Sequence, residues 1–406
     1  MLTRRYLLLG LAFALAIGAL TAAALTTPGT PDVGLWLQWA DNAARLGLRD
    51  GYVANGADYP PLSALALAAL ARAADSLGIE RFTALKVMLL LCLLVTALMV
   101  WAWSRRPWLA LATLAALALN SVALGYLDIL LAPPLLLGLW ALAQRRWALF
   151  SLGFALAVLV KWQPLIIAPF VGWYCLTAWR RPPRGLPSRL AAPVWDTALL
   201  VTPPLALGAL GVWGGWGAPI VASLGQAIAH PYLSGNALNL NWLATHALRA
   251  LAPDTFGGLE GGLARYILTD NPLLLAWSKP LFIAAYGLLL WRFTRAPQSL
   301  ATLLRFALAG FLAYFTFNTG VHENHLFIPV LLGLALAATG RSPALFAACA
   351  IALNINMALF YGLAGVGLPF SRAVNGLDLA LSLAALVTLA GCAVIARLGW
   401  LNNGQT

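Results

Sequence analysis

Long apolar runs separated by short polar segments dominate the chain. Most runs are rich in Leu and Ala, which favour helix, and a helix needs about 20 mostly apolar residues to cross a bilayer. The pattern predicts an all-α, polytopic membrane protein with about twelve transmembrane helices in a single domain, residues 1–406. The expected spans are residues 2–25, 84–104, 107–124, 126–143, 147–161, 163–179, 195–213, 279–294, 300–317, 325–339, 343–361 and 377–398.

The first apolar run follows a basic pair, Arg4 and Arg5. A cleaved signal peptide is one interpretation, because small residues stand near the end of the run. A retained first span is preferred, since the run is longer than the apolar core of a typical signal peptide.

Residues 60–82 are apolar but are not counted as a span. The segment opens with two prolines and carries Arg72, Asp75, Glu80 and Arg81, which is typical of an amphipathic helix at the membrane interface. With both termini inside, 15 of the 25 basic residues and one of the 13 acidic residues lie in the cytoplasm. A span at 60–82 would turn the later arginine pairs outward, against the positive-inside rule.

Composition excludes a soluble protein. Hydrophobic residues make up 62% of the chain, charged residues 9%, and the mean hydropathy is +0.83, whereas soluble domains are about a quarter charged. The net charge of +12 fits the positive-inside bias, and its spread along the chain argues against a nucleic-acid partner. The four cysteines lie far apart in apolar runs, so neither a disulfide framework nor a zinc site is expected.

Two long segments, 26–83 and 214–278, are expected outside the membrane on the outer face. Both are rich in Gly, Pro, Asn and Asp, yet they contain helix-like stretches at 33–47, 219–229 and 237–252. The loops expected in the cytoplasm are short. Any chemistry is therefore predicted on the outer face, at the membrane surface.

The polar residues expected on the outer face form a few groups. The candidates are Asp32; Asp58 and Tyr59 in DYPPL; Tyr126 and Asp128 in LGYLD; Lys161 and Gln163 in KWQP; and His322, Glu323 and His325 in VHENH.

Each candidate has a simpler interpretation. Asp32 and Asp58 are suited to capping the helices that follow them. Lys161 at a span end is suited to extending its ammonium group to the interface. The spacing of His322, Glu323 and His325 is compatible with a metal site, although no H-E-x-x-H pattern is present.

Taken together, the groups match the needs of sugar transfer from a lipid phosphate. An acceptor hydroxyl must lose a proton as it attacks the sugar, so a positioned carboxylate is needed as a base. The departing phosphate gathers negative charge, which cations or N–H donors must stabilise.

The chain resembles the GT-C glycosyltransferases that use polyprenyl-phosphate sugars, with the bacterial phosphatidylinositol-mannoside and GPI-mannosyltransferase-like groups nearest. The resemblance rests on the early acid with Trp36 and Trp39, on DYPPL, and on the G-x-x-D, K-x-Q-P and V-H-E-x-H segments in that order. It implies that Asp32 is the catalytic base and that Asp58 shapes the same pocket. It also implies that Lys161, His322 and His325 contact the donor phosphate. Tyr126 stands where related chains often have glutamine, which leaves the role of Asp128 open.

The resemblance implies an inverting enzyme without cofactor or bound metal, and no D-x-D triplet occurs. The expected reaction moves a hexose, with mannose as the first candidate, from a polyprenyl-phosphate donor to a hydroxyl of a glycolipid or other cell-envelope acceptor. The expected location is the bacterial cytoplasmic membrane, with the site facing the periplasm. Transfer to a lipid-linked oligosaccharide or a protein hydroxyl is an open alternative. A secondary transporter is the rival from another class, although the spans carry almost no charge and the acids crowd one face.

Overall fold

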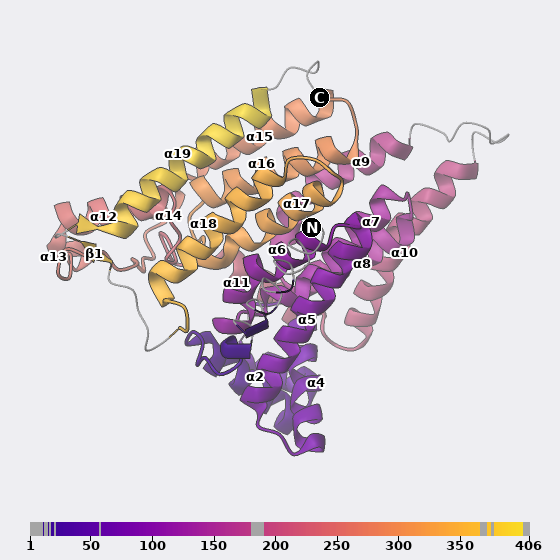
Figure 1. Cartoon of the computed structure of the whole chain (residues 1–406), viewed down its shortest axis with the longest axis horizontal. Coiled ribbons are helices and arrows are strands. Elements are labelled where there is room, and N and C mark those ends of the chain that lie inside the picture. Colours follow the sequence, from indigo (N-terminus) through magenta and orange to yellow (C-terminus); the bar gives the residue numbers. More distant parts are fainter. Residues whose placement is uncertain are drawn as a thin grey trace, which may run out of the picture.

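The structure, a computed structural model, describes residues 11, 15, 18–19, 22–56, 58–179, 191–365, 372–374 and 377–400. This part of the chain is almost entirely helical, with one short hairpin (Figure 1). The α-helices are α2 (Asp32–Leu46), α3 (Leu48–Asn55), α4 (Pro61–Leu77), α5 (Arg81–Ser104), α6 (Pro107–Ala118), α7 (Ala132–Ala143), α8 (Trp147–Val160), α9 (Ala168–Trp179), α10 (Ala191–Trp213), α11 (Gly217–Ile228), α12 (Leu240–Leu251), α13 (Pro253–Phe256), α14 (Pro272–Ala276), α15 (Lys279–Arg295), α16 (Leu300–Phe317), α17 (Phe327–Ala338), α18 (Pro343–Tyr361) and α19 (Leu379–Trp400). The tighter or wider helical turns are η1 (Leu119–Ala123), η2 (Leu127–Leu131), η3 (Gln163–Ile167) and η4 (Glu323–Leu326), and the strands are β1 (Ala373–Val374) and β2 (Leu377–Asp378).

Helices occupy the expected spans from residue 84 onward, which confirms the all-α, multi-pass membrane character. Five described helical stretches are both long and apolar enough to cross a membrane. The count of twelve stays a prediction, and the first expected span, 2–25, lies largely outside the described residues. The five stretches are Arg81–Ser104, Pro272–Arg295, Leu300–Phe317, Pro343–Tyr361 and Leu379–Leu398.

Most of the remaining apolar helices are shorter, and several begin or end in turns that are not regular α-helix. The π-helix η1 ends α6, and the 3-10 helices η2, η3 and η4 begin α7, α9 and α17. A 3-10 turn winds more tightly than an α-turn and turns of this kind are common at helix ends. Three of the polar segments expected on the outer face lie at these irregular turns, so their side chains are presented where the apolar helices stop.

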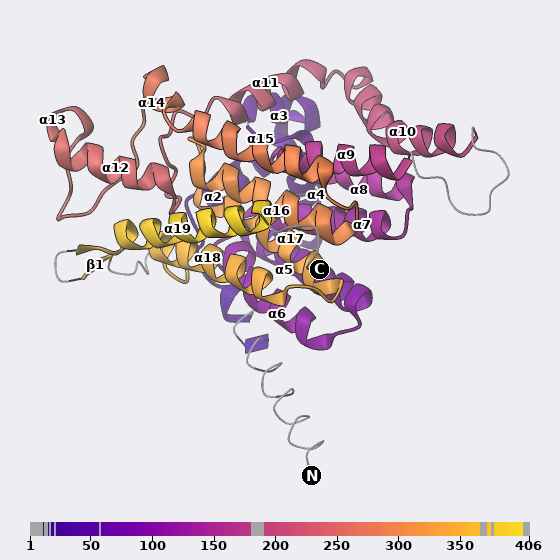
Figure 2. The ribbon, with the colours of Figure 1, turned by 90° about the horizontal axis from the view of Figure 1, so that it is seen from above.

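Helices α10 and α11 form a bent pair. Residues 198–213 and 217–228 together meet the length and composition of a span, but the two helices meet at 111°. The bend contains Gly215, whose φ of +75° is readily adopted by glycine. Helix α11 was expected within an outer loop, and the bend brings it close to α3 (Figure 2), where Trp216 contacts Tyr52.

Helix α4 covers most of the apolar segment that was left out of the span count. Its 17 residues begin at Pro61 in the first turn and end before Gly78, which has a left-handed conformation. Its buried face packs against α2, and the Ser63 hydroxyl donates to the carbonyl of Val160 at 2.6 Å. With 17 residues, it is not among the five helical stretches long and apolar enough to cross a membrane; its exclusion from the span count and its place at the interface stay predictions.

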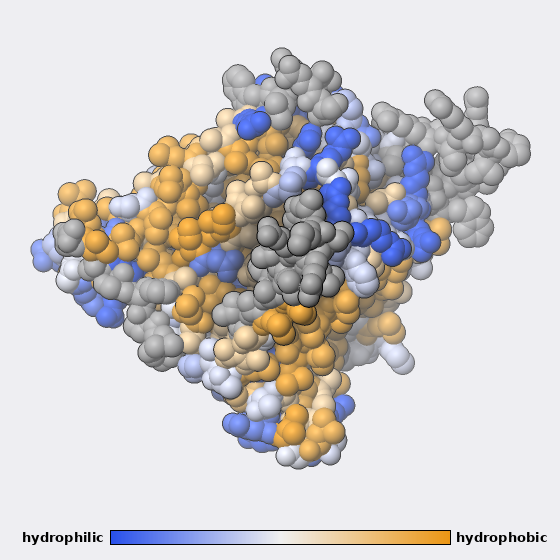
Figure 3. Space-filling model, in the orientation of Figure 1, coloured by the Kyte–Doolittle hydropathy of each residue, from blue (hydrophilic) through white to orange (hydrophobic). Residues whose placement is uncertain are grey.

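The apolar core is centred on α17, all twelve residues of which are buried. By contrast, few residues are buried in the apolar stretches that contain α15 and α19, which suits faces that contact lipid. In Figure 3, apolar side chains cover much of the visible face, and hydrophilic residues gather mostly toward its edges. The turn that precedes α17 is therefore anchored directly to the most buried helix.

Cysteine labelling tests the orientation of the chain. In a variant whose four native cysteines are replaced by alanine, Glu80→Cys is expected to react with a membrane-impermeant maleimide on intact cells. Gln144→Cys is expected to react only after the cells are opened, because the positive-inside rule places its arginine-flanked turn in the cytoplasm. Both positions are exposed, so accessibility of the side chain does not bias the comparison. The reverse labelling pattern would contradict the predicted orientation.

Candidate functional site

A buried ion pair joins two of the predicted site residues. The Lys161 ammonium group, at the end of α8, lies 2.8 Å from the Asp128 carboxylate in η2, and the two side chains are 8% and 1% exposed. The Asn324 amide in η4 donates to the other Asp128 oxygen at 3.0 Å. The lysine therefore does not reach out to the interface, and Asp128 connects three turns that are far apart in sequence.

A second set of polar contacts surrounds η4. The Tyr126 hydroxyl lies 2.5 Å from a carboxylate oxygen of Glu323. The His325 imidazole stacks on the ring of Tyr314, and its Nδ1 accepts a hydrogen bond from the backbone N–H of His322 at 3.3 Å. His325 and Glu323 are thus held by protein groups, which makes both of them parts of the framework of the turn.

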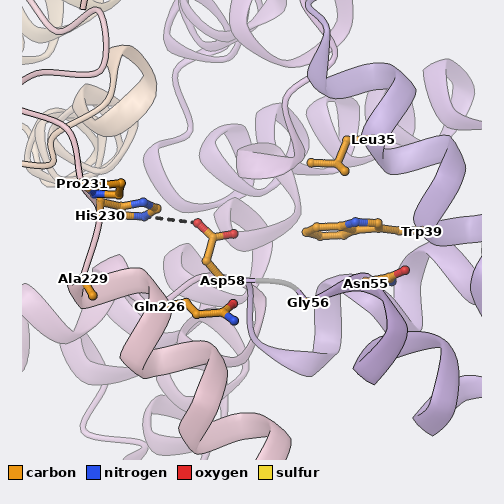
Figure 4. Close-up of a pocket in the computed structure, with 9 residues that line it drawn as sticks. All are labelled: Leu35, Trp39, Asn55, Gly56, Asp58, Gln226, Ala229, His230 and Pro231. Atoms are coloured by element: carbon orange, nitrogen blue, oxygen red, sulfur yellow. Dashed lines mark ion pairs between the residues drawn. The ribbon is translucent and has the colours of Figure 1, made fainter. Parts of the chain in front are cut away.

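Asp58 is paired with a histidine that the sequence analysis did not select. The Nε2 atom of His230 lies 3.2 Å from an Asp58 carboxylate oxygen. The His230 ring also meets the His322 ring edge-on, with 5.0 Å between centroids. Figure 4 shows Asp58 between His230, which follows α11, and Trp39 of α2. Asp58 therefore does not cap α4, for which no side-chain cap is present.

Asp32 lies in the first turn of α2 and does not cap it. The cap position is Pro31, and no side chain caps the helix. Among the described residues, none forms a hydrogen bond or ion pair with the Asp32 carboxylate. Its charge does interact with those of Lys161, Asp128 and Asp58. Asp32 is thus a partly buried acid without a fixed partner, close to the buried ion pair.

Aromatic rings pack beside the buried ion pair. The rings of Trp36, Trp39 and Tyr59 contact one another edge-on, with centroids 4.9 to 5.8 Å apart. The Lys161 ammonium group lies 5.2 Å from the centroid of the Tyr59 ring, within the range of a cation–π contact. Tyr59 of the DYPPL segment therefore lies against the ion pair, and its role in binding a substrate stays a prediction.

Four successive backbone carbonyls connect the chain before the Asp128 turn to α5 and to the segment around Asp32. They belong to residues 122–125, where the chain leaves the α-helical hydrogen-bond pattern. Lys86 donates to the first two, at 2.7 and 3.0 Å; the backbone N–H of Thr30 donates to the third at 3.0 Å; and the Trp36 indole donates to the fourth at 3.1 Å. Buried carbonyls need such partners. Gly125 has a φ of +80° and lies against Val33, so a larger residue there would separate the two segments.

The electrostatics of the site distinguish its two candidate acids. Burial raises the pKa of Asp32, the Asp128 and Asp58 carboxylates act in the same direction, and Lys161 opposes them. Burial would also raise the pKa of Asp58, but the hydrogen bond and charge of His230, with Lys161 and His322, lower it overall. Burial, together with His230 and Lys161, lowers the pKa of His322 to about 3. At neutral pH, Asp32 is therefore the more basic of these two carboxylates and His322 is uncharged.

The structure thus brings most of the predicted residues together. Asp32, Asp58, Tyr59, Asp128, Lys161, His322, Glu323 and His325 lie in one connected group. Gln163 begins η3 and makes no side-chain hydrogen bond with this group in the described part of the chain. Sequence reasoning missed His230, Asn324 and Lys86.

The metal interpretation has no support from the geometry. Within the described residues, no three or more His, Cys, Asp or Glu side chains are arranged to hold a metal ion. His325 Nδ1 already accepts a hydrogen bond, and Glu323 is bound by Tyr126.

No family model matches this chain, and no curated protein matches it. The resemblance to GT-C glycosyltransferases therefore stays an expectation drawn from its motifs.

Substitution of the buried ion pair tests its structural role. Lys161→Met is expected to lower the free energy of unfolding by about 3 kcal/mol, because it leaves the Asp128 charge buried without its partner. The double variant Lys161→Met/Asp128→Asn is expected to lose less than the sum of the two single variants. Thermal unfolding of the purified protein in detergent micelles would measure both.

The exposed pair Arg265 and Glu260 supplies the control. Its side chains are 69% and 53% exposed, so Arg265→Met and Glu260→Gln should each cost less than about 1 kcal/mol. Equal losses at the two pairs, or fully additive losses at Lys161 and Asp128, would contradict the prediction.

Proposed function

We propose that this chain is an inverting glycosyltransferase. It transfers a hexose, with mannose as the first candidate, from a polyprenyl-phosphate donor to a hydroxyl group on the outer face of a bacterial cytoplasmic membrane. The observation that carries the proposal is the grouping of Asp32, Lys161 and His322 at the ends of apolar helices. An unpaired carboxylate, a buried cation and an imidazole with an unpartnered nitrogen are what proton removal and phosphate departure require.

Asp32 is the base in this proposal. Its carboxylate has no fixed hydrogen-bond partner, and its pKa is raised above the ordinary value mainly by burial. A base is more effective when its pKa lies nearer the working pH. Asp58 is less suited to this role, because its carboxylate already accepts a hydrogen bond from His230 and its pKa is lowered.

His322 makes the first contact with the donor phosphate. Its Nε2 atom is buried and has no hydrogen-bond partner among the described residues. Lys161 is close by, but its charge is already matched by Asp128. The lysine therefore contributes to the local field, while the imidazole is available to donate a hydrogen bond to a phosphate oxygen.

The reaction follows from these positions. The acceptor oxygen attacks the anomeric carbon as its proton passes to Asp32, and a new glycosidic bond forms. The bond between the anomeric carbon and the phosphate oxygen breaks, with its electron pair leaving on polyprenyl phosphate. Attack on the face opposite the phosphate inverts the anomeric configuration. The isoprenoid tail of the donor remains among the lipid-facing helices throughout.

Replacement of the base tests the proposal. Asp32→Asn is expected to reduce transfer by at least about 100-fold, because general-base catalysis contributes on the order of 10² to 10⁴. Donor binding should persist, since the amide is nearly isosteric and removes a negative charge near the phosphate. Incubation with polyprenyl-phosphate mannose or polyprenyl-phosphate glucose and a membrane-lipid extract, followed by mass spectrometry, would measure transfer.

Asp50→Asn is the matched control on the same outer segment. Asp50 is exposed and, among the described residues, pairs only with its neighbour Arg49 at 3.3 Å, so its replacement should leave the transfer rate unchanged. Near-normal turnover in the Asp32 variant would remove Asp32 from the mechanism. Solute uptake into proteoliposomes without sugar transfer to any lipid would replace the transferase proposal with the transporter alternative.

A further inference from the structure

A cavity of about 470 Å³ opens beside the Asp58–His230 pair. It lies between helices α2 and α3 on one side and the end of α11 on the other (Figure 4). Asp58 and His230 form its polar wall, Leu35 and Trp39 form an apolar wall, and Asn55 and Gln226 lie at its edge. The proposed reaction uses Asp32, Lys161 and His322, none of which lines this cavity.

The walls of the cavity are held in place by contacts with the rest of the site. The His230 hydrogen bond fixes the Asp58 carboxylate. Trp39 is only 3% exposed and packs edge-on against Trp36 and Tyr59. Asn55 accepts a hydrogen bond from Asn42 at 2.8 Å. The cavity is therefore preformed, which is usual for small-molecule sites.

The chemistry of the walls selects a neutral, polyhydroxylated ligand. A carboxylate accepts hydrogen bonds and donates none, so the exposed part of Asp58 favours hydroxyl groups and disfavours a phosphate. Apolar C–H surface suits the Leu35 and Trp39 side. A sugar ring carries hydroxyl groups at its rim and C–H groups on its faces, so it matches both walls.

The position of the cavity favours the acceptor, and not the donor, as the molecule that occupies it. His230 separates it from His322, with 5.0 Å between the ring centroids, so the cavity adjoins the proposed phosphate contact without including it. Leu35 and Trp39, which line the cavity, belong to α2, the helix that begins at Asp32, so the cavity adjoins the helix that bears the proposed base. We infer that this cavity binds the sugar ring that carries the acceptor hydroxyl, an inference that rests on the proposed transferase function. The acceptor is then a glycan or glycolipid.

Filling the cavity tests the inference. Ala229 lines the cavity and is exposed at the end of α11, so Ala229→Trp blocks the space without removing a buried group. Ile228→Trp is the control, because Ile228 is 73% exposed on the same turn and does not line the cavity. With polyprenyl-phosphate mannose as donor and methyl α-D-mannopyranoside as acceptor, Ala229→Trp should raise the acceptor KM about tenfold or more. The rate of donor hydrolysis by water and the donor KM should not change.

Three outcomes decide the assignment. A raised acceptor KM with unchanged donor hydrolysis in Ala229→Trp, and wild-type behaviour in Ile228→Trp, supports an acceptor site. A raised donor KM with an unchanged acceptor KM overturns it, because the cavity would then hold the donor sugar. Unchanged kinetics in both variants overturns it as well.

A binding measurement separates this inference from the transferase proposal. Saturation-transfer NMR of methyl α-D-mannopyranoside with the protein in nanodiscs should give a signal for the wild type and Ile228→Trp, and none for Ala229→Trp. Inorganic phosphate should not compete with the sugar. This pattern in a protein without transfer activity would support the sugar site and contradict the transferase. Absence of the signal in the wild type would overturn the sugar site even if transfer occurs.

Discussion

The cost of burying a charge governs the arrangement of the site. An unpaired ammonium or carboxylate group inside a protein is strongly unfavourable, whereas a pair with a further hydrogen bond is tolerated. Lys161 and Asp128 meet this condition only because Asn324 supplies the additional donor. The three residues come from the end of α8, from η2 and from η4. The ends of these apolar helices must therefore meet at one place, and the other polar side chains are grouped around it.

A second constraint is the need to satisfy backbone carbonyls where a helix stops being regular. Carbonyls 122–125 accept from Lys86, Thr30 and Trp36, so the segment that begins α2 is fixed to the turn that bears Asp128. This contact sets the position of Asp32 relative to the ion pair. The position of the proposed base consequently depends on the side chains of Lys86 and Trp36 as well as on the backbone of Thr30.

The sequence predicts the parts of the structure that follow from hydropathy and from recognisable polar turns. Helices occur where the apolar runs lie, and the acids of the first outer segment approach Lys161 and His322. The number of spans cannot be derived from hydropathy alone. Hydropathy does not reveal which apolar runs begin or end in 3-10 or π turns, or that α10 and α11 meet at a sharp bend. His230 was missed because it stands in an irregular segment and its partner, Asp58, is far away in sequence. Lys86 was not selected because it stands within an apolar run that was expected to span the membrane. Asn324 was not selected because the candidates were chosen mainly for their ionisable groups.

Helix α11 is connected to α10 only through the sharp glycine bend, and the chain leaving it forms one wall of the Asp58 cavity. The opposite wall and the proposed base belong to α2, which is fixed independently to the Asp128 turn. The cavity is thus formed by two units with separate attachments, and only one of them, α2, also bears the proposed base. In the proposed transferase, substitutions in α11 alter one wall of the cavity while Asp32 keeps its position. The sharp bend before α11 is consequently a region in which acceptor specificity can diverge during evolution without displacing the proposed base.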